Sequence, residues 1–140
     1  MAVTLQSDGI QFANKKFTDS STGVDLDGIL TPYVGVGDTD TSSHSAGTST
    51  PDMDRYQNFV WTLTGNITLG NPTDEIAGTS GVFVFIHSGG ARTVSLSSDW
   101  ETVGAAGLTL STTDGAVDIV PYFVQSTGNI LLGTPQLAFS

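Results

Sequence analysis

Short apolar runs, separated by glycine, asparagine and proline, dominate the chain from Trp61 to Phe139. Residues 81–87 are apolar almost throughout, and residues 59–63 alternate between two faces. Further runs cover residues 92–96, 116–124, 130–132 and 136–139. A period of two is typical of a half-buried strand, and short strands at spacings of about 8–12 residues indicate a sandwich or barrel. The pattern predicts an all-β fold, specifically an antiparallel β-sandwich of jelly-roll or immunoglobulin-like type.

The same alternation selects the residues that we expect in the core of this sandwich, which should have about seven or eight strands. They are Trp61, Leu63, Val82, Val84, Ile119 and Phe123. No stretch of the chain shows a sustained helical period, and residues 99–103 are expected to form one short turn at most.

The pattern divides the chain into three parts. Residues 1–37 carry weak strand signals, including alternation in residues 4–6 and 9–12, and Pro32 lacks the N–H that a central strand needs. Residues 38–55 are rich in serine and threonine and poor in apolar side chains, which is typical of a loop. We therefore expect an extended N-terminal arm over residues 1–37, a linker loop over residues 38–55 and the sandwich body over residues 56–140.

Charge and cysteine content exclude several kinds of partner. The chain has no cysteine, so it can form neither a disulfide nor a thiolate metal site. Its net charge is −10 with only four cations, which leaves almost nothing to neutralise the phosphates of nucleic acids or anionic membranes. No apolar run approaches the roughly 20 residues of a membrane span. The N-terminus lacks the basic and apolar segments of a signal peptide, so we expect synthesis in a cytoplasm.

Hydroxyl groups take the place of charges in this composition. Only 13% of the residues are charged, against about 25% in a typical domain. Serine and threonine together supply 35 of the 140 residues. The surface must therefore be polar through hydroxyl and backbone groups rather than through salt bridges.

The two histidines and one acidic residue within an apolar run are the candidates for catalysis or metal binding. His44 lies in the serine- and threonine-rich segment, where we expect it to be solvated, and His87 ends an apolar run. A catalytic triad or metal site needs positioned partners, so we interpret both as structural. Asp118 interrupts an apolar run, where a carboxylate is costly unless it is hydrogen-bonded. We expect it to hold a loop through backbone N–H groups; a pair with Arg92 is a further alternative.

Acidic residues also occur in pairs spaced by two: Asp25 with Asp27, Asp38 with Asp40, and Asp52 with Asp54. Calcium takes about 6–8 oxygen ligands, and the full spacing of an EF-hand loop is missing. Two interpretations stay open, a cation bound at Asp38 and Asp40 or at Asp52 and Asp54, and acidic side chains that simply face solvent. We expect no cofactor.

A recurring set of packing residues and turns covers a little over half of the chain. It consists of Asn66-Ile67-Thr68-Leu69, Asn71-Pro72, residues 81–85, Arg92-Thr93-Val94 followed by Trp100, residues 108–113, residues 116–124, residues 128–132 and Phe139. This arrangement resembles a module that recurs in structural proteins of tailed bacteriophages, particularly tail fibres and capsid decoration proteins. The opening residues 5–12 also look like the start of many phage fibre and virion proteins.

The resemblance implies a virion component, assembled in the host cytoplasm and without enzymatic activity. The chain is short for a fibre and has no heptad or triple-helical repeat for a shaft. We therefore expect a capsid decoration, or cement, protein that binds and stabilises the viral shell. Its implied partners are the major capsid protein or another virion protein, together with further copies of the chain in a trimer. The alternative is a tail fibre or receptor-binding module that recognises a glycan on the host surface.

Apolar residues of the arm, too dispersed to form a core of their own, and one loop-like tryptophan are the candidate partner contacts. They are Phe12, Phe17, Ile29, Leu30, Tyr33 and Trp100. In a decoration protein we expect the arm to pair with an exposed sheet edge of a neighbour. In a receptor-binding module we expect Trp100, Tyr122 and the hydroxyl-rich loops to contact the glycan.

Overall fold

The computed structural model describes residues 4–6, 9–11 and 38–139. The chain divides into two compact units, Met1–Thr31 and Pro32–Ser140. In the first unit, β1 (Thr4–Gln6) and β2 (Gly9–Gln11) form an antiparallel hairpin. Both strands occur where the alternation predicts them. The candidate contacts of the arm, Phe12, Phe17, Ile29, Leu30 and Tyr33, lie outside the described residues.

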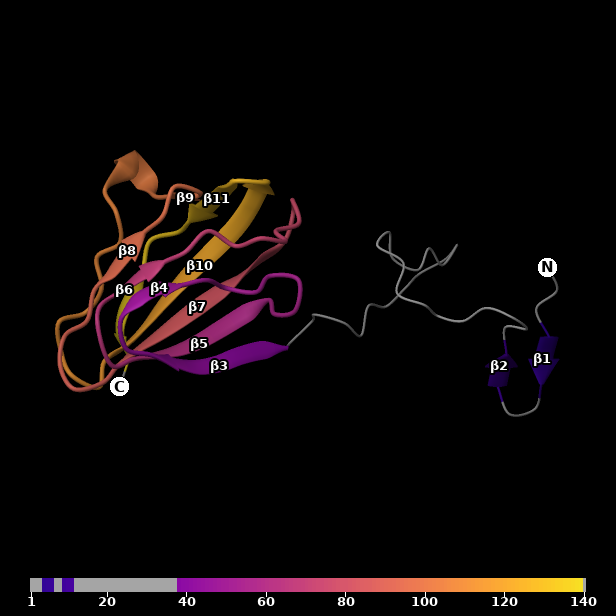
Figure 1. Ribbon diagram of the computed structural model, residues 1–140, viewed down its shortest axis with the longest axis horizontal. Coiled ribbons are helices and arrows are strands. Elements are labelled where there is room, and N and C mark those ends of the chain that lie inside the picture. The colour runs from indigo at the N-terminus through magenta and orange to yellow at the C-terminus, as the bar shows by residue number, and fades with distance from the viewer. Residues whose placement is uncertain (1–3, 7–8, 12–37, 140) are drawn as a thin grey trace. The chain divides into compact units, whose positions relative to one another are not determined.

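Three successive strand pairs of the second unit form stacked coils. The pairs are β3 (Thr39–His44) with β4 (Gly47–Ser49), β5 (Asn58–Leu63) with β6 (Ile67–Leu69), and β7 (Ser80–His87) with β8 (Val94–Leu96). The first strands β3, β5 and β7 lie parallel in a large sheet, and the second strands β4, β6 and β8 lie parallel in a small one (Figure 1). Each coil therefore places its residues directly beside those of the preceding coil.

The C-terminal strands extend the large sheet beyond β7. The long strand β10 (Val117–Ser126) runs antiparallel to β7, to β11 (Asn129–Leu132) and to β12 (Gln136–Phe139). At the edge of the sheet, β9 (Trp100–Glu101) pairs with β11 in parallel. A short 3₁₀ helix, η1 (Val103–Ala105), follows β9, and the described part of the chain has no α-helix.

The all-β prediction is confirmed, but the antiparallel part of it is wrong. Of the eight strand pairs among residues 38–139, five are parallel and three are antiparallel. Side chains alternate with a period of two in both kinds of pairing, so the hydrophobic pattern does not distinguish them. The finer expectation of a jelly-roll or immunoglobulin-like sandwich is not confirmed by the observed strand order.

Residues 38–55 do not form a linker loop, because they contain the first coil. Strand β3 pairs with β5 along its whole length, from Thr39 opposite Asn58 to His44 opposite Leu63. Threonine suits the pleated surface of a strand, and the main-chain ladder to β5 does not require apolar side chains. The low hydrophobicity of this segment therefore misled the prediction.

Both sheets contribute to a single core, which is dominated by aromatic rings. Phe83 lies at its centre and stacks on Phe59 and Phe85, with ring centroids 4.7 and 5.6 Å away. The small sheet adds Ile67 and Leu69 from β6 and Val94 from β8. The expected core residues Trp61 and Leu63 are buried in this core, as predicted.

Four other residues expected in the core face outward instead. They are Val82, Val84, Ile119 and Phe123. On β7 the buried positions are the aromatic ones, Phe83 and Phe85, and on β10 the buried series begins at Asp118. A change of one residue in parity moves every side chain of a strand to the other face. Val82, Val84 and Ile86 of β7 and Val117 and Ile119 of β10 therefore lie on the outer face of the large sheet, whereas Val120 and Val124 point into the core.

Candidate functional site

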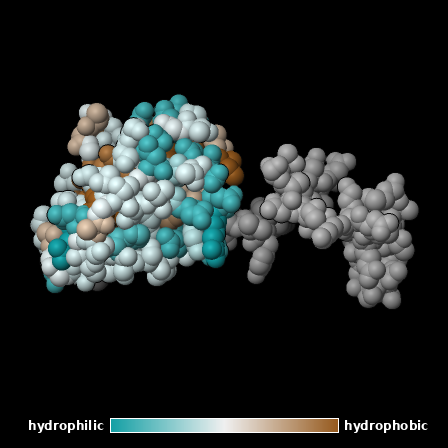
Figure 2. All heavy atoms as spheres, in the orientation of Figure 1, coloured by the Kyte–Doolittle hydropathy of each residue, from teal (hydrophilic) through white to brown (hydrophobic). Residues whose placement is uncertain are grey.

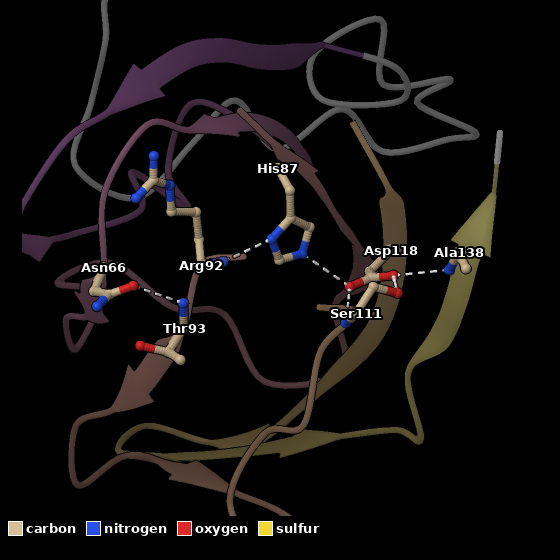
Figure 3. Close-up of polar contacts among 7 residues, drawn as sticks. All are labelled: Asn66, His87, Arg92, Thr93, Ser111, Asp118 and Ala138. Atoms are coloured by element: carbon tan, nitrogen blue, oxygen red, sulfur yellow. Dashed lines mark hydrogen bonds and ion pairs between the residues drawn. The ribbon is translucent and has the colours of Figure 1, made fainter. Parts of the chain in front are cut away.

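A buried polar network centres on Asp118, which lies among the inward residues of β10 (Figure 3). Its carboxylate accepts hydrogen bonds from the hydroxyl and the backbone N–H of Ser111, at 2.5 and 2.7 Å, and from the backbone N–H of Ala138, at 2.9 Å. His87 Nε2 lies 3.1 Å from the same carboxylate. Asp118 thus joins the loop before β10 and the strand β12 to β10, and the expected structural role is confirmed.

The hydrogen bonds of His87 define its tautomer. The backbone N–H of Arg92 donates to Nδ1 at 3.0 Å, so the proton of the ring lies on Nε2 and is donated to Asp118. A catalytic triad would require the ring to accept a serine proton, whereas Ser111 gives its hydroxyl proton to Asp118. Both ring nitrogens are therefore committed to the fold.

Two opposing effects set the pKa of the Asp118 carboxyl. Burial raises the pKa, because it disfavours the charged form. The hydrogen bonds donated by Ser111, Ala138 and His87 stabilise the carboxylate and outweigh burial, so the pKa lies below its usual value. The group is therefore ionised at neutral pH.

Arg92 is not an ion-pair partner of Asp118, so that alternative is wrong. Its guanidinium donates to the backbone oxygen of Ser88, at 3.1 and 2.8 Å, and to that of Gly89, at 2.8 Å. In Figure 3 the guanidinium points away from Asp118. Arg92 closes the turn after β7 and touches the network only through its backbone N–H.

A second polar cluster closes the end of the core at the first coil. Asp40, Ser42 and His44 occupy alternate positions of β3, in register with inward residues of β5. The Ser42 hydroxyl lies 3.2 Å from Asp40 and 2.8 Å from His44 Nε2, and the Ser49 hydroxyl lies 2.8 Å from His44 Nδ1. The indole N–H of Trp61 donates to Asp40 at 2.8 Å. Hydrogen bonds here take the place of apolar contacts.

His44 is part of this cluster and is not solvated as expected. Its ring centroid lies 4.2 Å from that of Trp61. Burial lowers the pKa of His44 and the charge of Asp40 raises it, with a net lowering. The ring is therefore neutral at pH 7 and can accept the Ser49 proton at Nδ1. Ser49 is only 8% exposed, so it is enclosed by the fold and we interpret the cluster as structural.

Trp100 is a core residue and does not present its ring to a partner, which corrects its assignment as a contact. It is 5% exposed, its indole N–H donates to the Gly70 oxygen at 3.0 Å, and its ring meets Phe83 edge-on. Tyr122 is equally buried; its hydroxyl donates to the Gln57 oxygen at 2.7 Å. An open depression of about 520 Å³ lies beside Trp100. It is lined by Leu96, Ser97, Ser98, Trp100, Glu101, Thr102, Ala105 and Gly107.

The outer face of the large sheet presents apolar side chains on four neighbouring strands, β5, β7, β10 and β11. We call it the apolar face and define it as Val60, Val82, Val84, Ile86, Val117, Ile119, Pro121, Phe123 and Leu131. Strand register arranges these side chains in rows, because directly opposite residues project to the same side. Val60, Val84 and Ile119 form one row, and Phe123 lies opposite Leu131 in another.

The apolar face carries no charge, although the chain is strongly acidic. The outward residues of β5, β7, β10 and β11 include no Asp, Glu, Lys or Arg, and Glu101 of β9, beside Leu131, is a carboxylate at the edge of the face. Phe123 and Leu131 are 44% and 38% exposed, and the other residues of the face are half-buried between their neighbours. Figure 2, by contrast, shows a side of the body on which hydrophilic and weakly polar residues predominate.

The described residues offer no assembled metal site. In the ranges that the structure covers, no three His, Cys, Asp or Glu side chains come together in a group that could hold an ion. Asp40 is engaged by Ser42 and Trp61, and the Asp52 carboxylate accepts the backbone N–H of Arg55 at 3.1 Å. No helix among these residues has the length and hydropathy to cross a bilayer.

Sequence reasoning missed the apolar face because it assigned several of these side chains to the core. The sequence of residues 81–87 contains a signal that could have identified the face. The phenylalanines occupy the odd-numbered positions and the smaller valines the even-numbered ones, so the two kinds of side chain lie on opposite faces of the strand.

Comparisons of the chain with protein-family models, with curated proteins and with solved structures find no match in any of the three. The resemblance to phage structural proteins therefore depends only on the sequence features that carry it.

Proposed function

We propose that this chain is a virion structural protein, a capsid decoration protein that binds and stabilises the viral shell. The observation that supports this most is the uncharged apolar face on an otherwise acidic body. Wide apolar patches on a soluble domain mark sites of association, whereas the polar clusters at Asp118 and His44 are engaged within the fold. The arrangement suits surface burial rather than catalysis, and the resemblance of residues 63–139 indicates the class of assembly.

In this proposal the N-terminal arm and the body have different tasks. The two sheets and their shared core act as a sandwich-like rigid body, and residues 1–37 anchor the protein to a capsid or other virion protein. The apolar residues of the arm would gain order by main-chain pairing with an exposed sheet edge, against a cost of about 1–2 kcal/mol for each fixed residue. The assembled form is a homo-oligomer, a trimer, located in the virion.

The alternative proposal is a tail fibre or receptor-binding module. A host glycan would then have to bind in the depression beside Trp100, where Ser97, Ser98 and Thr102 supply hydroxyls and Glu101 supplies a carboxylate. This alternative has less support, because the aromatic ring that would stack on a sugar is buried.

Quantifying the protein in purified virions separates the two proposals. A copy number on the order of hundreds per particle, matching the symmetry of a shell, is expected for a decoration protein. A few to a few tens of copies would place the protein on the tail and overturn the main proposal.

Binding to virions that lack the protein then tests the anchor. Deletion of residues 1–37 should leave a body that melts cooperatively but no longer binds the particles. Full occupancy by the truncated body would show that the arm is not the anchor.

A further inference from the structure

We infer that the apolar face is the surface through which copies of this chain contact one another. The inference rests on the proposed function only in assuming that the protein works in an assembly. The surface that the copies share is the apolar face, and its occupant is another copy of the chain.

Charge is the first argument for this occupant. Two copies that each carry a net charge of −10 repel each other, and a contact that included their carboxylates would bring like charges together out of water. A contact through the apolar face lowers this cost, because the face itself carries no charged side chain and Glu101 lies at its edge, beside Leu131. A basic partner, by contrast, would be recognised by carboxylates placed within the contact surface.

Shape is the second argument. The central row, Val60, Val84 and Ile119, consists of β-branched side chains on three adjacent strands and therefore forms a regular, gently twisted surface. Such sheet faces pack on one another about 10 Å apart, with their side chains interdigitated. Packing of this face on the same face of a second copy is an isologous contact with two-fold symmetry, so it joins two chains rather than closing the trimer that the resemblance implies.

Area is the third argument. Four neighbouring strands about 4.8 Å apart, with rows spanning about seven residues, give a patch of roughly 19 by 24 Å, or roughly 450 Å² in projection. Each partner in a stable complex contributes about 800 Å². The hydroxyls of Thr41 and Ser43, which continue the rows onto β3, supply part of the remainder. An apolar centre with a polar rim is the usual anatomy of a stable interface.

The mass of the full chain in solution, measured by light scattering after gel filtration, tests this inference. The wild-type protein should have a multiple of the 14.5 kDa chain mass at high micromolar concentration. Val84→Lys, at the centre of the face, should reduce the mass to that of one chain, even though it lowers the net negative charge. Phe123→Lys, at a more exposed position, should do the same with less risk to folding.

Val103→Lys is the matched control. It makes the same chemical change in η1, where the side chain is 82% exposed and lies outside the face, and it should leave the oligomer intact. Thermal melting followed by circular dichroism would establish that each variant is folded. A wild-type protein that stays monomeric at these concentrations would overturn the inference, as would folded Val84→Lys and Phe123→Lys variants that stay oligomeric.

Virion binding separates failure of this inference from failure of the proposed function. If the wild-type protein is monomeric and only the two face variants lose binding to virions, the face belongs to a shell protein; the inference then fails and the function stands. If the variants become monomeric but the wild-type protein never associates with virions, the function fails and the inference stands.

Discussion

Asp118 illustrates what can and cannot be predicted from single residues. A carboxylate in an apolar run must be hydrogen-bonded, and this requirement correctly predicts backbone N–H donors. The donors themselves, Ser111 and Ala138, and the partner His87 come from three separate segments that only the folded chain brings together. Arg92 was the wrong partner because its guanidinium is used by the turn that follows β7.

Replacing Asp118 with asparagine should lower the free energy of unfolding by about 3 kcal/mol, because a neutral amide cannot satisfy the same set of donors. The pKa of Asp118 is lower in the folded protein than its usual value of 3.8. Its stabilising contribution is therefore complete above that value and is lost as the pH falls through the folded-state pKa. Urea unfolding at a series of acidic pH values should show this loss in the wild-type protein and its absence in the variant.

Asp54→Asn is the control for the Asp118 prediction. The Asp54 side chain is exposed and is not part of a buried hydrogen-bond network in the described structure. The substitution should change the free energy of unfolding at neutral pH by no more than about 0.5 kcal/mol. Equal stability of Asp118→Asn and wild type between neutral and acidic pH would contradict the assigned role.

At the scale of elements, the coils depend on close contacts at their corners. Asparagine side chains of the second coil accept backbone N–H groups of the third coil and its following loop. At the corners the pairs are Asn66 with Thr93 and Asn71 with Asp99, and Asn58 at the start of β5 makes a third pair with Val82 of β7. In the sequence these asparagines indicate only turns, because a coil corner and a hairpin turn use the same residues. The parallel stacking could therefore not be predicted from local chemistry, whereas the positions of most strands could.

Gly65, at the corner between β5 and β6, is required by this stacking. A Cβ at this position would lie 1.5 Å from the backbone oxygen of Ser45 in the adjacent coil, which no side-chain rotation can relieve. Gly65→Ala should therefore reduce the free energy of unfolding by about 3 kcal/mol or more. Urea unfolding of the full chain measures the loss.

Gly128→Ala is the comparison for the Gly65 prediction. Gly128 has a φ of 74° and open space around it, so alanine there should cost only about 1–2 kcal/mol of backbone strain. If Gly65→Ala were the milder substitution, the corner at Gly65 would not lie against the backbone of Ser45 as described.

At the scale of the whole molecule, a small number of charges is distributed unevenly. The body keeps its carboxylates on loops, on edge strands and in the Asp118 network, and leaves the outward residues of β5, β7 and β10 uncharged. Composition alone predicts a hydroxyl-rich acidic surface. It does not predict where the uncharged region lies, because that depends on which parity of each strand faces the core.

Association of the chain should strengthen with ionic strength, because salt screens the repulsion between acidic copies while leaving the apolar contact intact. The Debye length falls from about 30 Å at 0.01 M to about 10 Å at 0.1 M salt, so most of the effect is expected in that range. Sedimentation equilibrium at several sodium chloride concentrations should show a severalfold increase in the association constant. An association constant that fell with added salt would indicate contacts between opposite charges, and the apolar face would then not be the contact surface.

The polar residues of the first coil have a consequence for how such a fold can lengthen through gene duplication. A duplicated coil placed before β3 would stack its apolar side chains on Asp40, Ser42 and His44, which already satisfy one another. A coil inserted between β5 and β7 would meet Phe59 on one side and Phe83 on the other, and would continue the aromatic stack. Descendants of this architecture should therefore grow from the middle, with the hydrogen-bonded coil retained as a fixed terminus.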